Sequence, residues 1–345
     1  MTVLNVAVIG FGLAGAVFHA PLIAAEPRMR LAAVVTSSAE RADRARAEHP
    51  QAGVFTTVDD LLSGGTDLDL VVVATPNRTH APLARRMLAA GLPVVVDKPF
   101  ALTAAEGESV IAVAREAGLL LTVFQNRRWD SDFRTARQLI ETGALGQVWR
   151  FESRFERWRP RPKGGWRELG GAEEGAGILY DLGSHLIDQA LTLFGPVAEV
   201  YCELDARRPG VRADDDAFLA LTHSGGVRSQ LWMSAVAAQL GPRLRVLGSE
   251  RAYVCYGLDP QEAALRAGRR PGDGQPWGRV DPEQWGLLGT DGELAPAPSA
   301  PGAYPDFYAG VAAALLDGAA PPVDPADAVA TLRIIERARD SARAR

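Results

Sequence analysis

Short runs of valine, isoleucine and leucine alternate with longer segments rich in alanine and arginine over the first third of the chain. The runs, all between residues 3 and 124, are VLNVAVIG, LAAVVT, LDLVVVAT, LPVVVDK and LLLTVF. Apolar runs without polar alternation are typical of strands buried on both faces, and the segments between them are long enough for crossover helices. This pattern predicts a doubly wound parallel sheet.

The pattern changes after Phe124. Residues 130–146 predict a helix closed by glycine, and four later runs alternate apolar with polar residues: 148–158, 197–207, 217–223 and 227–236. Alternation predicts a half-buried, mostly antiparallel sheet. We therefore expect an α/β fold with two domains, residues 1–123 and 124–345. The Gly/Pro/Asp-rich tract 266–305 predicts surface loops, and residues 325–345 predict a final helix with Pro325 near its start.

Composition agrees with a folded protein of two domains and narrows the list of partners. The 345 residues are 47% hydrophobic and 23% charged, and the formal net charge is -5, which gives no reason to expect nucleic acid or an anionic membrane. The two cysteines have no metal-site or disulfide spacing, which fits a reducing cytoplasm. The N-terminus lacks the basic region of a signal peptide, and no apolar run approaches a membrane span.

The first predicted strand ends in GFGLAG, which is a G-x-G-x-x-G motif. Gly10 permits a tight turn, Gly12 lets the backbone approach a pyrophosphate, and Gly15 lets the following helix pack closely on the strand. The amides at the helix N-terminus would hold the anion. The motif predicts a dinucleotide site, and the alternative is a glycine-rich turn without a ligand.

The second predicted strand ends VVTSSAER, without the acidic residue that binds a free ribose 2′-hydroxyl in NAD sites. Thr36, Ser37 and Ser38 stand in its place, and Arg41 follows. Hydroxyls and a guanidinium would bind a 2′-phosphate, so this segment predicts a preference for NADP over NAD. The alternative is that these residues cap the next helix, a role open to Ser38.

Two further predicted strands end in polar residues at the same sheet edge. VVVDKPF presents Lys98 and stops at Pro99, and ATPNRTH breaks at Pro76 and Asn77. Open α/β sheets bind ligands at this edge, so Lys98 is a candidate ligand-binding group. The alternatives are a solvated lysine at a strand end and an ordinary Pro/Asn turn.

The segment GILYDLGSHLIDQALTLFG predicts a helix in the second half. Asp181, His185 and Asp188 follow at i, i+4 and i+7, so the spacing predicts that they share one face. An Asp one turn from a His can fix its tautomer for general base catalysis. A structural histidine is the alternative, and metal binding lacks a second His at ligand spacing, so we expect no metal. The basic segment 154–168 favours a solvated strand and loop over nucleic-acid binding.

Together, GFGLAG, ATPNRTH, VVVDKPF, QNRRWDSDF, GGWRE and YDLGSHLIDQ resemble the motifs of the Gfo/Idh/MocA oxidoreductase family, from about residue 3 to residue 340. The resemblance implies a Rossmann domain followed by an α+β domain with a large open sheet, which binds substrate and packs in homodimers or homotetramers. The active site is expected between the domains. Asp97 stands where the family has Glu in its Glu-Lys-Pro motif.

Within the family, the motifs look closest to the group of NADP-dependent scyllo-inositol dehydrogenases, although Gln125 stands where that group has His. The resemblance implies that Lys98 binds the reacting oxygen, His185 is the general base and Asp181 orients it. Motif and resemblance together predict cofactor contacts from Gly10, Phe11, Gly12, Leu13, Ala14, Gly15, Thr36, Ser37, Ser38, Arg41, Thr75, Pro76, Asn77, His80, Asp97, Lys98, Pro99, Trp166 and Arg167. Predicted substrate contacts are Lys98, Gln125, Asn126, Arg127, Asp181 and His185.

These features predict an NADP-preferring, or NAD-using, dehydrogenase that acts on a secondary alcohol or ketone of a cyclic polyol or sugar. Two alternatives remain at this point. One is a redox-neutral, NAD-dependent sugar-processing enzyme similar to the NAD-dependent glycosidases. The second predicted strand disfavours it, because no acidic residue stands at its end to bind NAD. The other is a non-catalytic dinucleotide sensor, for which Lys98, Asp181 and His185 would offer no advantage.

Overall fold

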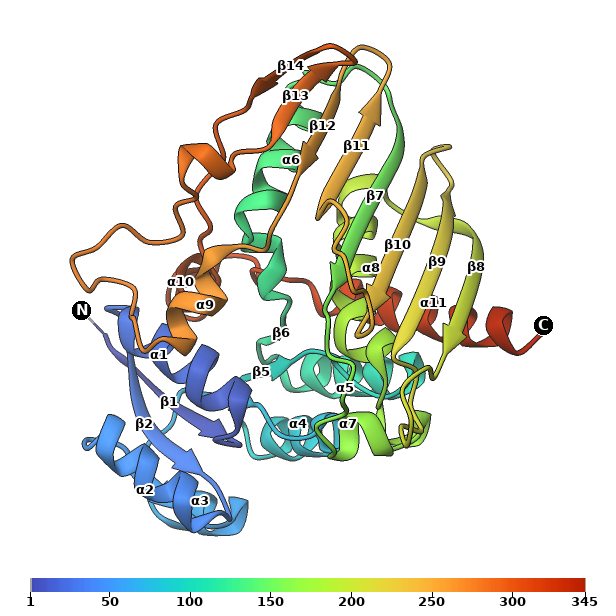
Figure 1. Cartoon of the computed structure of the whole chain (residues 1–345). Coiled ribbons are helices and arrows are strands. Elements are labelled where there is room, and N and C mark those ends of the chain that lie inside the picture. Colours follow the sequence, from blue (N-terminus) through green and yellow to red (C-terminus); the bar gives the residue numbers. More distant parts are fainter. Residues whose placement is uncertain (1, 345) are drawn as a thin grey trace. The chain divides into compact units, whose positions relative to one another are not determined.

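A computed structural model describes residues 2–344 of the chain (Figure 1). It contains two compact units. The first comprises the chain up to Asn126 together with Gln261–Trp277 and Ala303–Ala328, and the second comprises Arg127–Pro260, Gly278–Gly302 and the chain from Val329. Two late segments thus return to the first unit. The domain boundary near residue 123 that the sequence predicts stays a prediction.

The first unit is built on a six-stranded parallel sheet in the order β3-β2-β1-β4-β5-β6. This is the Rossmann order, with its switch point between β1 and β4. The central strands carry Val, Ile and Leu because both of their faces are buried. The strands are β1 (Leu4–Ile9), β2 (Met29–Val35), β3 (Gly53–Phe55), β4 (Leu70–Val73), β5 (Val94–Asp97) and β6 (Leu121–Phe124).

The connections between these strands are helical, as the apolar runs and their spacing predict. A π-helical turn, η1, leads from the glycine turn into α1, which packs against α10, a helix from the late segment of this unit. The helices are η1 (Ala14–His19), α1 (Ala20–Ala25), α2 (Ala39–Glu48), α3 (Val58–Ser63), η2 (Asn77–Thr79), α4 (His80–Ala89), α5 (Ala104–Ala117), α9 (Pro260–Arg266) and α10 (Pro305–Asp317).

The second unit is built on an eight-stranded sheet in the order β14-β13-β12-β11-β7-β10-β9-β8 (Figure 1). Its neighbouring strands are antiparallel except β7 and β10, which run parallel. The strands are β7 (Val148–Glu156), β8 (Val197–Asp205), β9 (Asp216–His223), β10 (Arg228–Ser234), β11 (Leu244–Gly248), β12 (Ala252–Cys255), β13 (Leu287–Thr290) and β14 (Glu293–Pro296). The predicted fold class, a parallel Rossmann sheet plus a mostly antiparallel sheet, is confirmed.

Helix α8 packs against β7 and β10 of the second sheet, and a π-helical turn, η5, precedes it. Its residues Ser184 to Ala190 are all buried, so this part of the helix is covered on every side and not only on the side that faces the sheet. The helices of this unit are η3 (Asn126–Trp129), α6 (Ser131–Glu141), α7 (Trp166–Leu169), η4 (Ala172–Glu174), η5 (Leu179–Gly183), α8 (Ser184–Phe194), η6 (Pro282–Gln284) and α11 (Pro325–Arg343).

The tract 266–305, for which the sequence predicts surface loops, also contains a hairpin. Its strands are β13 and β14, and Thr290 pairs with Glu293 at the turn. Strands β3, β11 and β12 were also absent from the prediction, because each is short and lacks the unbroken run of valine, isoleucine or leucine that marks β4 and β5. Both cysteines are buried, and they form no disulfide bond with each other. Within residues 2–344, no helix is long and apolar enough to cross a membrane.

Candidate functional site

The glycine turn of the first unit follows β1 and is shaped as the motif predicts. Gly10 has φ +98°, a conformation that side-chain-bearing residues rarely adopt, and a Cβ there would lie 2.6 Å from the carbonyl oxygen of Ala74. A Cβ at Gly15 would overlap the carbonyl oxygen of Gly10. At Gly12 the nearest atom to an added Cβ is Nη1 of Arg41, at 3.8 Å, so the backbone there is open to an approaching group.

Of the residues after β2, one caps the next helix, one is buried and two are exposed. Ser38 is the N-cap of α2, and its Oγ accepts a hydrogen bond from the amide of Arg41 at 3.4 Å. The capping role that the sequence left open for Ser38 is therefore present. Thr36 is buried, whereas Ser37 and Arg41 are exposed. The guanidinium of Arg41 therefore places a cation beside the glycine turn.

His80 lies behind the ends of β4 and β5 and is fully buried. Its Nδ1 lies 2.8 Å from the carbonyl oxygen of Pro99, and its Nε2 lies 2.8 Å from that of Thr75. Burial lowers the pKa of His80, and a neutral ring donates only one of these two hydrogen bonds. His80 therefore connects the turn after β4, which carries Pro76, to the turn after β5, which carries Lys98. Its predicted contact with the cofactor stays a prediction.

A buried chain of polar groups supports the end of β5. The amide of Lys98 donates to Oδ1 of Asp97 at 2.9 Å, and the same oxygen lies 3.7 Å from Nε2 of His19. Nδ1 of His19 lies 2.7 Å from the hydroxyl of Tyr308 on α10. Burial opposes ionisation of Asp97, but His19 and Lys98 outweigh it and hold the pKa of Asp97 below its usual value. The carboxylate beside Lys98 is therefore charged at neutral pH.

The sequence did not point to His19 or Tyr308 as parts of this arrangement. The signal in the sequence was the position of His19 within the apolar run FHAPLI. A histidine in a run that is expected to be buried needs a hydrogen-bond partner. Tyr308 comes almost three hundred residues later, so no local pattern connects the two side chains.

Gln125 and Asn126 follow β6 and are buried. The amide of Gln125 donates to the carbonyl oxygen of Val123 at 2.8 Å, while its side-chain Oε1 is buried and accepts no hydrogen bond from the described residues. Buried polar atoms are normally paired, so this oxygen is a candidate ligand contact. Lys98 and Gln125 thus lie at the carboxyl ends of adjacent strands, at the same sheet edge as the glycine turn.

In the second unit, Asp181 lies in η5 and His185 in the first turn of α8. Asp181 is about one-third exposed, at 33% of its side chain, and His185 is buried. Asp188 is also buried, and the prediction that the three side chains share one face stays a prediction. The carboxylate of Asp188 forms two hydrogen bonds with the guanidinium of Arg128, at 2.6 and 2.8 Å, because a buried carboxylate needs a cationic partner.

Two other predicted residues of this unit also have partners. Arg127 is buried and pairs with Asp130, with Nη1 3.0 Å from Oδ2, and its guanidinium stacks over the ring of Phe155. Arg167 is exposed, with its guanidinium over the Trp166 ring and its Nε 3.9 Å from Oδ1 of Asp181. Their roles toward substrate and cofactor stay predictions.

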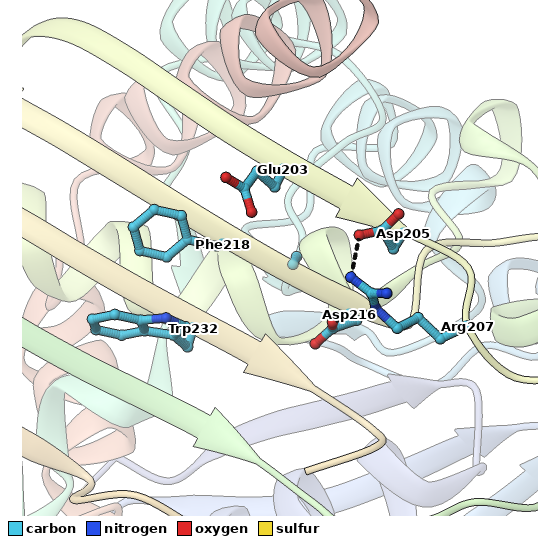
Figure 2. A pocket seen from close by; sticks show the side chains of 7 residues that line it. Glu203, Asp205, Arg207, Asp216, Phe218 and Trp232 are labelled. Atoms are coloured by element: carbon cyan, nitrogen blue, oxygen red, sulfur yellow. Dashed lines mark hydrogen bonds and ion pairs between the residues drawn. The ribbon is translucent and has the colours of Figure 1, made fainter. Parts of the chain in front are cut away.

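A separate pocket of about 350 Å³ lies on the sheet of the second unit, over β8, β9 and β10 (Figure 2). None of the predicted site residues lines it. Arg207 pairs there with Asp205 and Asp216, and the rings of Phe218 and Trp232 lie 5.1 Å apart. Within residues 2–344, no three His, Cys, Asp or Glu side chains are placed to hold a metal ion.

Comparisons with known proteins agree with this arrangement. Residues 4–125 match the model of an oxidoreductase family with an NAD-binding Rossmann fold, and residues 133–254 match the GFO/IDH/MocA C-terminal domain. The chain is 40% identical to the oxidoreductase YdgJ of Escherichia coli, over 99% of this chain and 97% of that protein. It is 36% identical to the scyllo-inositol 2-dehydrogenase (NADP(+)) IolW of Bacillus subtilis, over 99% and 94%.

A solved structure, the oxidoreductase YvaA from Bacillus subtilis, matches with a TM-score of 0.91 at 34% identity, covering 99% of this chain and 96% of that one. A Rossmann sheet with a glycine turn, followed by an open mixed sheet, is the architecture expected of a dinucleotide-binding oxidoreductase of this kind. The chain belongs to the Gfo/Idh/MocA oxidoreductase family.

Proposed function

We propose that this protein is an NADP-preferring dehydrogenase that interconverts a secondary alcohol and a ketone on a cyclic polyol or sugar. Its family makes it an oxidoreductase that acts on CH–OH groups. The observation that carries the proposal lies in the first unit. An open glycine turn ends β1, and Lys98 ends β5, two strands away at the same sheet edge.

The residues present fit a dinucleotide. Gly12 offers open backbone, the amides after it can hold a pyrophosphate, and Arg41 with Ser37 can hold a 2′-phosphate. When bound, the nicotinamide would take up hydride from the alcohol carbon or return it to the ketone carbon. The NADP dependence of IolW supports the same preference.

Lys98, Asp181 and His185 would perform the proton chemistry. The ammonium of Lys98 would stabilise the developing alkoxide, because a fixed positive charge lowers the cost of the oxyanion. The imidazole of His185 would take the hydroxyl proton during oxidation and return it during reduction. Asp181, one turn before His185, would orient that ring and support its charge.

Two observations support a polyol or sugar as substrate. IolW acts on an inositol, and 99% of this chain aligns with it. The buried Oε1 of Gln125 is an acceptor that a substrate hydroxyl would satisfy. Gln125 is therefore a candidate for selecting among hydroxylated rings.

The experiment is a spectrophotometric screen of inositols, sugars, sugar acids and keto-sugars with NADP and NAD, in both directions. We expect a change in nicotinamide absorbance with at least one cyclic polyol or sugar, faster with NADP. The matched control is Lys98→Met, which should be inactive on the same substrate. Absence of any signal across the panel with either cofactor would rule out this substrate class.

We also propose a homodimer or homotetramer, as the family resemblance implies. Sedimentation velocity of the purified chain measures the assembly, and a monomer at micromolar concentration would contradict it.

A further inference from the structure

The loop between β8 and β9, residues 206–215, contains buried charges, although the aspartate run that begins at Asp214 is typical of a charged turn. The side chains of Arg208 and Asp215 are only 5% and 3% exposed, and Nε of Arg208 lies 2.8 Å from Oδ2 of Asp215. Moving two charged groups out of water is costly, so a buried ion pair often contributes little to the stability of the fold. The contacts around the pair show what it holds in place.

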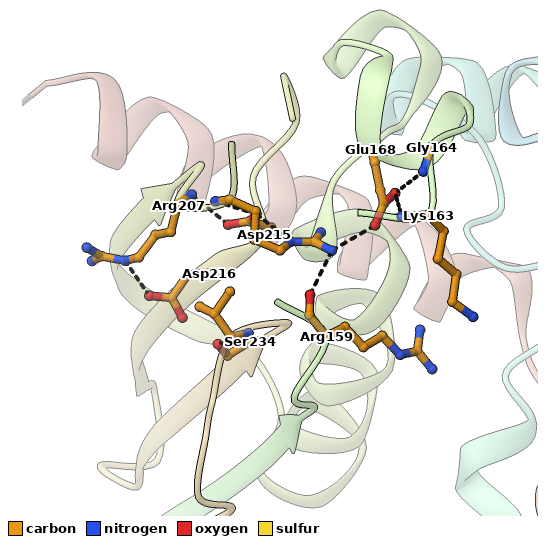
Figure 3. Close-up of polar contacts among 10 residues, drawn as sticks. Arg159, Lys163, Gly164, Glu168, Arg207, Asp215, Asp216 and Ser234 are labelled. Carbon is orange, nitrogen blue, oxygen red and sulfur yellow. Dashed lines mark hydrogen bonds and ion pairs between the residues drawn. The ribbon is translucent and has the colours of Figure 1, made fainter. Parts of the chain in front are cut away.

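Arg208 connects this loop to the segment that carries Trp166 and Arg167. Its Nη1 donates to Oε1 of Glu168 at 2.9 Å and to the carbonyl oxygen of Arg159 at 3.2 Å. The other carboxylate oxygen of Glu168 accepts the amides of Lys163 and Gly164, both at 2.8 Å (Figure 3). Glu168 therefore fixes the turn before α7 and is itself fixed by Arg208.

The backbone strengthens the same connection. The carbonyl oxygen of Glu168 accepts the amides of Arg212 and Ala213, at 2.9 and 3.2 Å. Within the loop, the carboxylate of Asp215 also accepts the amides of Arg207 and Arg208, at 2.7 and 3.1 Å. Because α7 has only four residues, these contacts replace the support that a longer helix would give itself.

Arg167 is the residue whose position depends on this support. Its side chain is 52% exposed, so packing alone does not fix it, and its Nε lies 3.9 Å from Oδ1 of Asp181. Its carbonyl oxygen accepts the amide of Gly177 at 3.1 Å, just before the helix that carries Asp181. Arg167 thus reaches Asp181 from a segment held by Glu168.

The Asp181 side of this contact is fixed by the residue before Asp215. Oδ2 of Asp214 accepts the amide of Leu179 at 2.8 Å, and its carbonyl oxygen accepts the amide of Ile178 at 2.8 Å. A Cβ at Gly177 would overlap the Asp214 carboxylate, so only glycine allows this approach. Consecutive aspartates therefore hold the two segments that bring Arg167 and Asp181 together.

We propose that Glu168, Arg208 and Asp215 are positioning residues that hold the guanidinium of Arg167 beside the carboxylate of Asp181. The cation favours the ionised carboxylate and limits its rotation, which keeps Asp181 ready to orient His185. This role rests on the proposed function of Asp181 and His185. Asp214 performs the matching role for the start of their helix.

The variants are Asp215→Asn and Glu168→Gln, which keep the shape of each side chain and remove its charge. Arg207→Gln is the matched control, because Arg207 lies in the same loop, pairs with Asp205 and Asp216, and is 57% exposed. Hydrogen exchange gives a readout without activity. Amides of residues 163–170 should exchange faster in Asp215→Asn and Glu168→Gln than in wild type, and at the wild-type rate in Arg207→Gln.

Activity then tests the connection to Asp181. Asp215→Asn should lower kcat by about tenfold, with a smaller change in KM, and move the acid limb of the kcat profile to higher pH. Arg167→Gln should have the same effects. In the Arg167→Gln background, Asp215→Asn should lower kcat by less than about twofold, since the two residues act through one contact.

Unchanged exchange at residues 163–170 would overturn the proposal, whatever the enzyme's substrate. Faster exchange with unchanged kcat, or additive effects in the double variant, would overturn the link to Asp181. An inactive wild type that still shows the exchange difference would contradict the proposed function and leave the anchoring of the loop supported.

Discussion

The hydroxyl of Tyr308 lies 2.7 Å from Nδ1 of His19, so α10 completes a buried polar chain that ends at Asp97, the residue before Lys98. Both side chains are fully buried. Burial, with a contribution from Asp97, raises the pKa of Tyr308, so its phenol remains protonated. The late segment of the first unit therefore supports the strand end that carries Lys98.

Removal of this hydroxyl should destabilise the protein. Tyr308→Phe leaves a buried imidazole nitrogen without its partner, and we expect a loss of about 1–3 kcal/mol in the free energy of unfolding. Urea denaturation measures this change. Tyr256→Phe is the control, since Tyr256 is 65% exposed and should change stability little. Equal effects of the two variants would contradict a structural role for the His19–Tyr308 contact.

Lys98→Met and His185→Ala should each lower kcat by roughly 100-fold or more, the usual contribution of a charge-stabilising or acid–base group. NADP affinity should change little, because neither residue belongs to the glycine turn or the end of β2. Calorimetry measures the affinity and steady-state kinetics measure kcat. A fall in affinity that parallels the fall in kcat would assign these residues to the cofactor site instead.

Arg41→Ala should reduce the preference for NADP over NAD by about tenfold or more, since a charge-assisted hydrogen bond contributes about 1.5–3 kcal/mol. The affinity for NAD should stay near its wild-type value. Calorimetric Kd values for both cofactors test this. Arg44→Ala, on the same helix and paired with Glu48, is the control. Equal selectivity in wild type and Arg41→Ala would remove Arg41 from the 2′-phosphate site.

Gly15→Ala and Gly12→Ala should have different effects although both change the same motif. A Cβ at Gly15 overlaps the carbonyl oxygen of Gly10, so Gly15→Ala should lower thermal stability as well as cofactor affinity. A Cβ at Gly12 has only Arg41 near it, at 3.8 Å, so Gly12→Ala should fold normally and lose affinity alone. Thermal unfolding and cofactor titration separate the two outcomes. Unimpaired binding by Gly12→Ala would place the pyrophosphate elsewhere.

Stability should depend on pH through His223, which lies between the carbonyl oxygen of Gly195 and Oγ of Ser229. Burial lowers the pKa of His223, so between about pH 7.5 and 5.5 the unfolded chain takes up a proton that the folded protein does not. Its contribution to stability is therefore present above the unfolded pKa of about 6.5 and is lost as the pH falls.

Comparison with His223→Asn isolates this group from others that titrate in the same range. The difference in unfolding free energy between wild type and variant should be largest near pH 7.5 and should narrow toward pH 5.5. Urea denaturation at each pH measures it. A difference that stays constant with pH would show that His223 does not carry this dependence.

Patterns of a few adjacent residues determined most strands of the first sheet, the glycine turn and the family of this protein. Buried valine runs predicted β1, β2, β4, β5 and β6, because a strand covered on both faces has to be apolar throughout. The positions of Gly10 and Gly15 predicted a turn that the structure confirms, since a positive φ and a close approach exclude a side chain at these points. The motifs also sufficed to identify the family.

Contacts between distant segments decided the rest. The aspartate run 214–216 is typical of a charged turn, yet Asp215 is buried and Asp214 is half-buried. Arg208 of the same loop pairs with Asp215, and the amide of Leu179, from a segment 35 residues earlier, donates to Asp214. Asp188 is paired with Arg128, sixty residues earlier in the chain, a contact that no local spacing predicts. Local spacing determines which side chains can meet on one helix, whereas the partner that compensates a buried charge depends on the tertiary fold.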